Sequence, residues 1–339
     1  MIRVAVTEAS QVAEARRRAT GVAETLGFDG TAGGRAAIVA TELATNLVKY
    51  ATGGEMLIGA YEDETGTGVE ILALDRGTGI ADIADALRDG HSTGGSPGTG
   101  LGAVRRQSQA FDIAAWPGRG LAVLARVVGT GSKPSGTVPG IGIPPVPRWG
   151  AIGVPLRGET VNGDAHCIRP SGDGWTALVV DGLGHGPLAA QASEAAVRAF
   201  RNHEHEAPGS ILAAIHAALG HTRGAAASVA RYEPGRDTLV FAGIGNVAGA
   251  VVTGGAVKRL VSLSGTAGLV ARRIQEFEYP FTPRSLLVMC SDGIGTNWSL
   301  DAYPGLVEAH PSLVAGVIYR DFARVRDDAT VLVVREPAA

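Results

Sequence analysis

The sequence predicts an α+β protein of two domains, and three observations carry this prediction. The chain has 339 residues, which suits about two domains of ordinary size. A stretch crowded with glycine and proline, residues 129–150, separates two halves of different pattern. The first half mixes helical periodicity with strand pairs, and the second half is dominated by short apolar strands. We therefore predict domains at residues 1–128 and 151–339.

The composition places the chain among globular proteins with sizeable cores. Hydrophobic residues make up 45% and charged residues 19%, and the formal net charge is −3. This charge provides no basic field for nucleic acid or anionic membrane, so neither is expected as a partner. Two cysteines argue against a disulfide scaffold, and the first residues lack a signal-peptide pattern. These features favour a location in the cytoplasm.

The segment 129–150 shows almost no periodic pattern. We interpret it as an inter-domain linker that is semi-extended where proline is dense. The alternative is an ordered loop that packs against one of the domains.

The first domain is expected to form an α/β sandwich. Apolar residues recur at helical spacing in two segments, and two pairs of strand-like segments are each joined by a turn rich in glycine. The expected helices cover residues 11–26 and 35–50, and the expected strands cover 56–61, 69–75, 111–115 and 120–128. Helices combined with antiparallel strands favour this layered arrangement.

The second domain is expected to contain two packed sheets with helices outside. Two apolar strands, 176–180 and 285–290, each run directly into an acidic turn, and alanine-rich segments give the helices. The expected helices cover residues 187–201 and 210–219, and the further strands cover 227–232, 238–243, 247–252 and 330–334. This number of strands in one domain favours a sandwich of two sheets.

Three polar residues lie on one face of the second expected helix. Glu42, Asn46 and Lys49 are spaced by four and three residues, so they project from neighbouring positions. A carboxylate, an amide and a cation together can bind a water, a metal ion and a phosphate. Most charged stripes on helices are only solvated faces, and this stripe gains meaning from the glycine-rich segments that follow.

Two glycine-rich segments follow that helix. Asp75 ends a strand and precedes Gly77 and Gly79, whose missing side chains let a ligand approach the backbone. Such an aspartate can accept a hydrogen bond from an exocyclic amine. The second segment, 98–102, precedes a short helix at 104–109 and suits a phosphate at a helix N-terminus. It does not follow a strand within a βαβ unit, which excludes a Rossmann fingerprint.

The ordered set resembles the GHKL (Bergerat) ATP site, and across residues 1–128 it resembles the RsbT-type and RsbW-type serine kinases. The resemblance implies ATP and Mg²⁺ as cofactors, with Glu42 as the general base and Asn46 holding the Mg²⁺ ion. Lys49 would lie near the phosphates and Asp75 would bind the adenine amine. The residues implied to frame the nucleotide, beneath a lid at 91–97, are Gly77, Gly79, Thr99, Gly100, Leu101 and Gly102.

Four acidic elements recur in the second half, each at a strand end or turn. They are Gly163-Asp164, Asp181-Gly182, Asp292-Gly293 and Asp327-Asp328. Hard divalent ions need oxygen ligands, and carboxylates on separate strands can converge on them. A single Asp-Gly pair is usually a turn. Four acidic elements in this order, three of them beside an apolar strand, instead favour a metal centre.

These segments resemble the SpoIIE-type branch of the metal-dependent (PPM) protein phosphatases, whose fold is an αββα sandwich. The glycine-rich run after Asp181 is most similar to the RsbX type. The resemblance implies two Mn²⁺ or Mg²⁺ ions bridged by Asp181, the catalytic ligand, and direct attack of activated water on phosphoserine or phosphothreonine. The implied ligands are Asp164, Asp181, the Gly182 carbonyl, Asp292 and Asp327, with Asp328 as an alternative or supporting ligand.

The two resemblances together imply a bifunctional switch, a serine/threonine kinase joined to a phosphatase. Its expected protein substrates are small STAS-like antagonists of anti-sigma factors. Kinases of this fold often dimerise, so a homodimer is also an expectation. Two alternatives stay open: a phosphatase regulated by an ATP-sensing domain that transfers no phosphate, and a binding protein that sequesters a sigma factor or antagonist without catalysis.

Overall fold

The computed structural model describes residues 1–63, 66–80, 82–87, 100–129, 149–171 and 174–336. The chain forms two compact units, which we describe separately. Unit 1 contains Met1–Pro147 together with Ala302–Arg320, and unit 2 contains Arg148–Asp301 together with Asp321–Ala339. Across the described ranges, none of the helices combines the length and apolar character that a membrane span requires.

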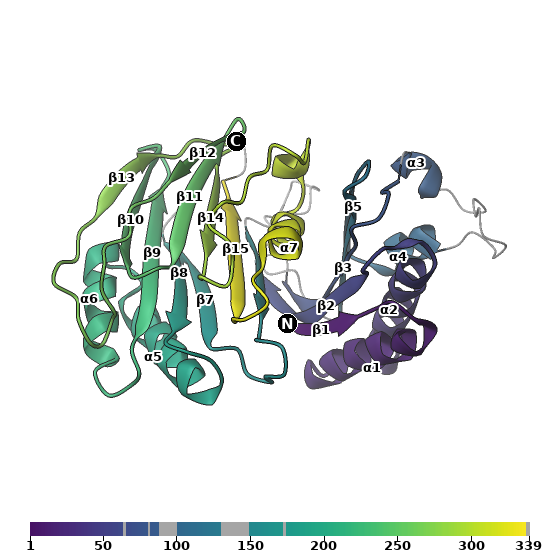
Figure 1. Ribbon diagram of the computed structural model, residues 1–339, viewed down its shortest axis with the longest axis horizontal. Coiled ribbons are helices and arrows are strands. Elements are labelled where there is room, and N and C mark those ends of the chain that lie inside the picture. The colour runs from purple at the N-terminus through teal and green to yellow at the C-terminus, as the bar shows by residue number, and fades with distance from the viewer. Residues whose placement is uncertain (64–65, 81, 88–99, 130–148, 172–173, 337–339) are drawn as a thin grey trace, which may run out of the picture. The chain divides into compact units, whose positions relative to one another are not determined.

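Unit 1 contains a five-stranded antiparallel sheet in the order β1-β2-β3-β5-β4. Its strands are β1 (Ile2–Ala5), β2 (Glu55–Asp63), β3 (Gly66–Leu74), β4 (Ala110–Trp116) and β5 (Gly120–Val128). Its first helices are α1 (Ala9–Thr25), α2 (Gly30–Tyr50), α3 (Ile83–Ala86) and α4 (Gly100–Gln107). Figure 1 shows α1 and α2 lying along the sheet. The helices and paired strands predicted for this region are confirmed, with shifts at their ends.

Helix α2 begins at a side-chain cap and packs through small residues. Asp29 accepts a hydrogen bond from the Ala32 amide at 2.8 Å, which satisfies one of the donors left open at a helix N-terminus. Ala36, Ala40 and Ala44 recur every four residues and are buried, so α2 can approach the sheet closely. The opposite face of α2 is more accessible and carries the polar residues of the predicted nucleotide site.

The second face of this sheet is covered by a segment from far along the chain. Ile71 and Ala73 belong to the core beneath α1 and α2, so Leu72 and Leu74 point to the other face because side chains alternate along a strand. Both leucines are fully buried there. Helix α7 (Pro311–Phe322) packs on them at Gly316, where the leucine methyl groups lie 3.4–3.6 Å from the position of an added Cβ.

The sequence analysis did not predict α7, and it placed residues 302–320 in the second domain. A 3-10 turn, η1 (Leu306–Glu308), precedes the helix. The near-continuous apolar runs of β3 and β5 are typical of a sheet that is covered on both faces. These runs indicate that something covers the second face of the sheet. What covers the second face could not be read from local sequence.

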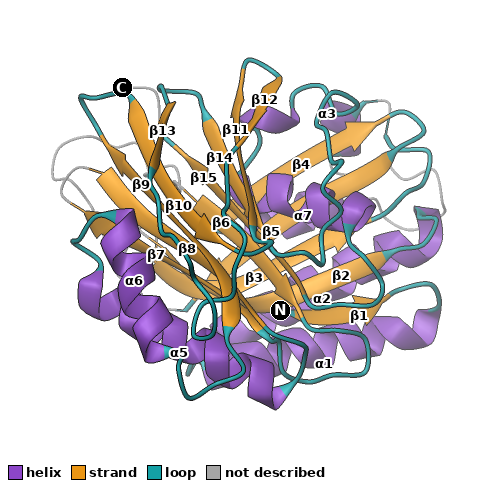
Figure 2. Cartoon of the chain, turned by 60° about the vertical axis from the view of Figure 1, so that its left-hand side comes forward, coloured by secondary structure: helices purple, strands orange, loops and turns teal. Residues whose placement is uncertain are grey.

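Unit 2 contains two five-stranded sheets, ordered β13-β10-β9-β8-β7 and β12-β11-β14-β15-β6. Figure 2 shows the strands of this unit with α5 and α6 beside them. The first sheet contains β7 (Asp164–Ser171), β8 (Gly174–Gly182), β9 (Ala225–Glu233), β10 (Thr238–Ile244) and β13 (Phe277–Pro280). The second contains β6 (Trp149–Val154), β11 (Ala248–Thr253), β12 (Ala256–Arg259), β14 (Leu286–Cys290) and β15 (Ala329–Arg335).

One core lies between these sheets and another lies under the helices. Trp175, Phe241 and Phe281 pack with Leu287 and Leu332, so residues of both sheets share the inner core. Helices α5 (Pro187–His203) and α6 (Pro208–Ala218) cover the outer face of the first sheet through a separate cluster that contains Phe200 and Ile215. The predicted pair of packed sheets is confirmed. Strand β6 begins at Trp149, inside the segment predicted as linker.

Candidate functional site

The acidic residues of unit 2 come from the ends of four strands. Asp164 begins β7 and Asp181 lies near the end of β8, and the two are directly paired across these antiparallel strands. Side chains at paired positions lie on the same face of a sheet, so the two carboxylates are neighbours. Asp292 follows β14, and Asp327 precedes β15, in the other sheet. The backbone amide of Asp292 donates to the Asp181 carboxylate, which ties the two sheets together at this end.

Two further polar contacts position this cluster. Asn246 donates from Nδ2 to Asp292 Oδ2 at 2.6 Å. Asp328 accepts from the amides of Leu156 at 2.7 Å and Gly163 at 2.9 Å, so both of its oxygens are engaged by the backbone. Asp328 therefore holds the loop before Asp164. This contact is compatible with the second of its two expected roles, that of a supporting residue.

The glycines of the acidic elements are required by close packing. A Cβ on Gly182 would lie 2.2 Å from the Ala189 carbonyl oxygen in the first turn of α5, and a Cβ on Gly293 would lie 1.8 Å from the Asp328 carbonyl oxygen. A Cβ on Gly163 would lie 2.7 Å from Asp328 Oδ2. Each Gly-Asp or Asp-Gly pair thus combines a carboxylate with a neighbour that lets another segment approach the backbone.

The carboxylates of the cluster disfavour one another's ionisation. Burial raises the pKa of Asp181 to about 8, and the charges of Asp164 and Asp292 act in the same direction. Burial also raises the pKa of Asp164 to about 7, with a contribution from the charge of Asp328. Burial and the charge of Asp327 raise the pKa of Asp292. The cluster therefore concentrates negative charge that a cation would balance.

The cluster fits a hard divalent cation by its chemistry. Asp164 is 7% exposed, and its Oδ2 has no hydrogen-bond partner among the described residues. A buried oxygen of this kind is costly unless something binds it, and carboxylates are the ligands that Mg²⁺ and Mn²⁺ prefer. Within the described ranges no three acidic, histidine or cysteine side chains already lie at metal-ligand spacing. Rotamer changes of the aspartates would be needed to share a cation.

The predicted nucleotide residues of unit 1 come together around α2. Glu42 and Asn46 are half-buried on this helix, and Lys49 is exposed one turn further on. Gly100, the first residue of α4, lies over them. A Cβ added at Gly100 would lie 3.3 Å from Asn46 Oδ1 and 3.6 Å from Glu42 Oε2. The structure thus places Gly100 beside the polar face of α2.

Asp75 lies at the end of β3, beside the end of α2. The Gly77 amide donates to its Oδ1 at 2.6 Å, and the Arg76 amide donates to the Thr52 carbonyl at 3.1 Å. Asp75 is 6% exposed, and burial raises the pKa of its carboxyl. Gly79 has a positive φ of 74° and packs against the Trp116 carbonyl, which explains why glycine is needed there.

Some predicted nucleotide residues have a structural role or are not described. Gly102 is buried, and Leu101 packs against the core of unit 1. Thr99 and the predicted lid at 91–97 lie outside the described residues. Asn246 and the segment 302–320 were missed by the sequence analysis. Asn246 directly follows the glycine-rich run Gly243-Ile244-Gly245, which was an available signal, whereas the segment 302–320 contains no comparable motif.

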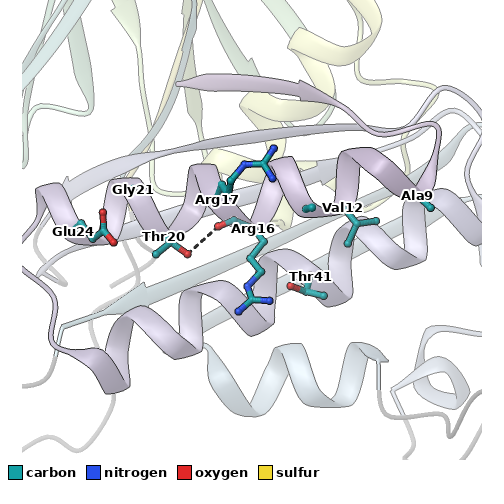
Figure 3. Close-up of a pocket in the computed structure, with 9 residues that line it drawn as sticks. Ala9, Val12, Arg16, Arg17, Thr20, Gly21, Glu24 and Thr41 are labelled. Atoms are coloured by element: carbon teal, nitrogen blue, oxygen red, sulfur yellow. Dashed lines mark hydrogen bonds between the residues drawn. The ribbon is translucent and has the colours of Figure 1, made fainter.

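A separate groove of about 760 Å³ runs along the outer side of α1 and reaches α2 at Thr41. Figure 3 shows Arg16, Arg17 and Thr20 of α1 on this groove. None of the predicted nucleotide-binding residues lines it.

The two halves of the chain match different family models. Residues 5–128 match the model of the histidine kinase-like ATPase domain. The serine/threonine-protein kinase RsbT of Bacillus subtilis (strain 168) is 35% identical over 114 residues, which cover 34% of this chain and 86% of RsbT. The chain belongs to the RsbT family. Residues 171–337 match the model of Stage II sporulation protein E (SpoIIE), so this RsbT relative also carries a SpoIIE-type phosphatase domain.

Solved structures are similar to part of the chain, and the first of them shares its fold. A structure described as "The bacterial stressosome: a modular system that has been adapted to control secondary messenger signaling" is 24% identical, covers 56% of this chain and 98% of its own, and has a TM-score of 0.52. RsbX in complex with magnesium is 19% identical over 55% of this chain and 94% of its own, with a TM-score of 0.46. The predicted α+β class, a GHKL-like domain followed by a PPM-type phosphatase domain, is confirmed.

Proposed function

We propose that this RsbT relative is a bifunctional switch that phosphorylates a protein serine or threonine with unit 1 and removes the phosphate with unit 2. The observation that carries the proposal is the acidic cluster, because two sheets contribute carboxylates that raise one another's pKa. A binding protein without catalysis would have no use for such a costly arrangement.

In the phosphatase reaction the cluster would hold two Mn²⁺ or Mg²⁺ ions, with Asp181, Asp164, Asp292, Asp327 and the Gly182 carbonyl as ligands. When bound, such ions activate water and neutralise the phosphate charge. Besides burial, the charges of Asp164, Asp292 and Asp327 all raise the pKa of Asp181, which suits a ligand that bridges two ions. Asn246 and Asp328 would orient Asp292 and the loop before Asp164.

In the kinase reaction Glu42 would accept the proton of the substrate hydroxyl, and Asn46 would hold the Mg²⁺ of ATP. Gly100 lies beside both residues, where a side chain would crowd Asn46. Asp75 would accept a hydrogen bond from the adenine amine, and Lys49 would lie near the phosphates. Phosphoryl transfer depends on positioning and charge stabilisation, which a rigid helix face can supply.

The proposed partner is a small STAS-like antagonist protein that carries the serine or threonine. RsbT, the curated relative, is named a serine/threonine-protein kinase, which supports protein rather than small-molecule substrates. A homodimer stays a prediction.

The experiment is a phosphate-release assay with Mn²⁺ on a phosphoserine STAS-domain protein, paired with ATP labelling of its unphosphorylated form. We expect metal-dependent release and ATP-dependent labelling from the same chain. Neither activity under any metal or nucleotide condition would contradict the proposal and favour a sequestering protein.

A second candidate is a phosphatase controlled by an ATP-sensing unit that transfers no phosphate. The grouping of residues 302–320 with unit 1 favours it, because this segment lies within the part of the chain that matches SpoIIE. Phosphate release without any ATP labelling would support this candidate over the first.

A further inference from the structure

Helix α7 contacts the strand that carries Asp75. Arg320, which is 3% exposed, donates from Nη1 to the Asp75 carbonyl oxygen at 2.7 Å. A buried guanidinium needs partners of this kind, since an unpaired one would cost several kcal/mol. The charge of Arg320 also lowers the pKa of the Asp75 carboxyl, against the larger effect of burial. The end of α7 is thus bonded to the residue proposed to bind adenine.

The rest of the segment 302–320 is held on the same sheet by specific polar contacts. Ser312 donates to Glu70 Oε2 at 2.8 Å and accepts from Arg126 Nη2 at 3.2 Å, and all three residues are buried. Trp116 donates from Nε1 to the Pro304 carbonyl at 3.0 Å, and its ring meets Tyr303 edge-on at 5.1 Å. These contacts specify the position of the segment on the sheet, beyond apolar packing.

The same C-terminal end of α7 is also bonded to the loop that carries Asp292. The last helical residue, Phe322, accepts from the Gly295 amide at 2.8 Å. Two residues later, the Arg324 amide donates to the Gly293 carbonyl at 2.7 Å. Gly293 follows Asp292 directly, and Asp327 is only three residues beyond Arg324. Two proposed metal ligands therefore depend on where α7 ends.

We propose that α7 couples the two sites, so that nucleotide bound beside Asp75 shifts Arg320 and changes the position of the Asp292 loop. This proposal rests on the proposed function, because it assigns its regulation to named residues. Both contacts are made at the C-terminal end of α7, where only three residues separate Arg320, bonded to Asp75, from Arg324, bonded to Gly293. Nucleotide can act in this way only if it binds one position of α7 better than another.

The coupling has a direct test in phosphate release. We expect a non-hydrolysable ATP analogue to change the turnover of a small aryl phosphate by about fivefold or more, the usual lower range for coupled sites. Arg320→Met should bind the analogue and yet lose this response. Arg259→Met is the matched control, because Arg259 also donates to a backbone carbonyl, that of Trp298, at 2.8 Å and belongs to unit 2. This control should respond as the parent chain does.

A second measurement does not depend on activity. Hydrogen–deuterium exchange should change on analogue binding in peptides that cover 302–322 and 291–295, and Arg320→Met should remove the change at 291–295. Trp116→Phe, which keeps an aromatic side chain but loses the bond to Pro304 and some buried volume, is a milder variant if Arg320→Met does not fold. It should weaken the response of both peptides.

The outcomes separate this proposal from the proposed function. Turnover and exchange that stay constant while calorimetry shows bound analogue would overturn the coupling and leave the phosphatase assignment intact. Absence of turnover, together with exchange changes in both peptides, would overturn the phosphatase assignment and support the coupling through α7.

Discussion

The proposed nucleotide site presents three of its polar groups along one helix, whereas the acidic cluster collects its carboxylates from the ends of four strands in two sheets. Glu42 and Asn46 are one turn apart on α2, so helix geometry alone aligns them. Asp181 and Asp292 meet only because β8 and β14 end at the same place. The first arrangement is local, and the second depends on the whole of unit 2.

This difference sets how each site should respond to substitution. Glu42 and Asn46 lie on accessible positions of α2, outside the row of buried residues that packs on the sheet, so they can be changed with little effect on the core. The acidic cluster is held by glycines that have no room for a Cβ and by buried carboxylates with raised pKa values. We expect the nucleotide site to lose function without loss of stability, and the acidic cluster to link function, pH and stability.

The largest expected effect is on phosphate release. Asp181→Ala removes the carboxylate that interacts with three other acidic residues, so metal-dependent turnover should fall to background. The matched control is Asp301→Ala, an exposed aspartate of unit 2, which should keep full turnover. The measurement is phosphate release from a phosphoserine protein with Mn²⁺. If Asp181→Ala released phosphate as fast as the parent chain, the assignment of the acidic cluster as a metal site would be wrong.

A buried ion pair should give the next largest effect, on the stability of unit 1. Arg126 donates to Glu70 at 2.7 Å and also bonds to Asp63, and all three side chains are buried. Arg126→Met leaves two buried carboxylates without their cation, so the free energy of unfolding should fall by about 3–5 kcal/mol. Urea denaturation measures this change in the free energy of unfolding.

The control for this prediction is Arg18→Met, which breaks an exposed ion pair with Glu14 on α1. Exposed pairs of this spacing contribute only about 0.3–0.5 kcal/mol. Equal losses in the two variants would show that the Arg126 network does not stabilise the sheet.

Asn46→Ala should affect nucleotide binding and leave the fold unchanged. Loss of an amide that holds Mg²⁺·ATP should weaken binding roughly 30-fold, or about 2 kcal/mol. Phosphorylation of the STAS-domain protein should fall with it, while phosphate release in the absence of ATP is retained. Asn202→Ala, an exposed asparagine on α5, is the control. A fully active Asn46 variant would refute the assignment of the ATP site.

A further expected effect is a dependence of stability on pH. Asp181 and Asp164 have pKa values of about 8 and about 7 in the folded chain, above the value of about 3.9 for an unfolded aspartate. The folded state therefore binds more protons between about pH 4 and pH 8, and stability falls as pH rises through this window. In chelator the Tm should drop from pH 5 to pH 8, and less steeply in Asp181→Asn.

Addition of Mn²⁺ extends this test, because cations bound to the cluster would displace the protons of the Asp181 and Asp164 carboxyl groups. The rise in Tm on adding Mn²⁺ should be larger at pH 8 than at pH 5. A rise that is independent of pH, or equal in Asp181→Asn, would count against the cluster as the metal site.

Much of this organisation could be predicted from local sequence. The spacing of Glu42 and Asn46 places them on one helix face, and Asp181 and Asp292 each follow a short apolar run that is typical of a buried strand. The pairing of Asp164 with Asp181 needed the register of β7, a strand that the sequence analysis missed because it is interrupted by His166, Arg169 and Pro170.

The contacts of residues 302–320 could not be predicted in this way. Ser312 meets Glu70 across 242 positions of sequence and Arg320 meets Asp75 across 245. No periodicity or motif reports which distant segment covers a sheet face. Asn246 was missed although a glycine-rich run precedes it, since its role comes only from its bond to Asp292.

The most direct test of the account is the fate of one phosphate on a STAS-domain protein. With Asp181→Asn and labelled ATP we predict that the label accumulates on serine or threonine, and that parent chain with Mn²⁺ then releases it as inorganic phosphate. No label on the protein, although Asp181→Asn binds ATP, would contradict the bifunctional switch and leave unit 1 as a nucleotide sensor.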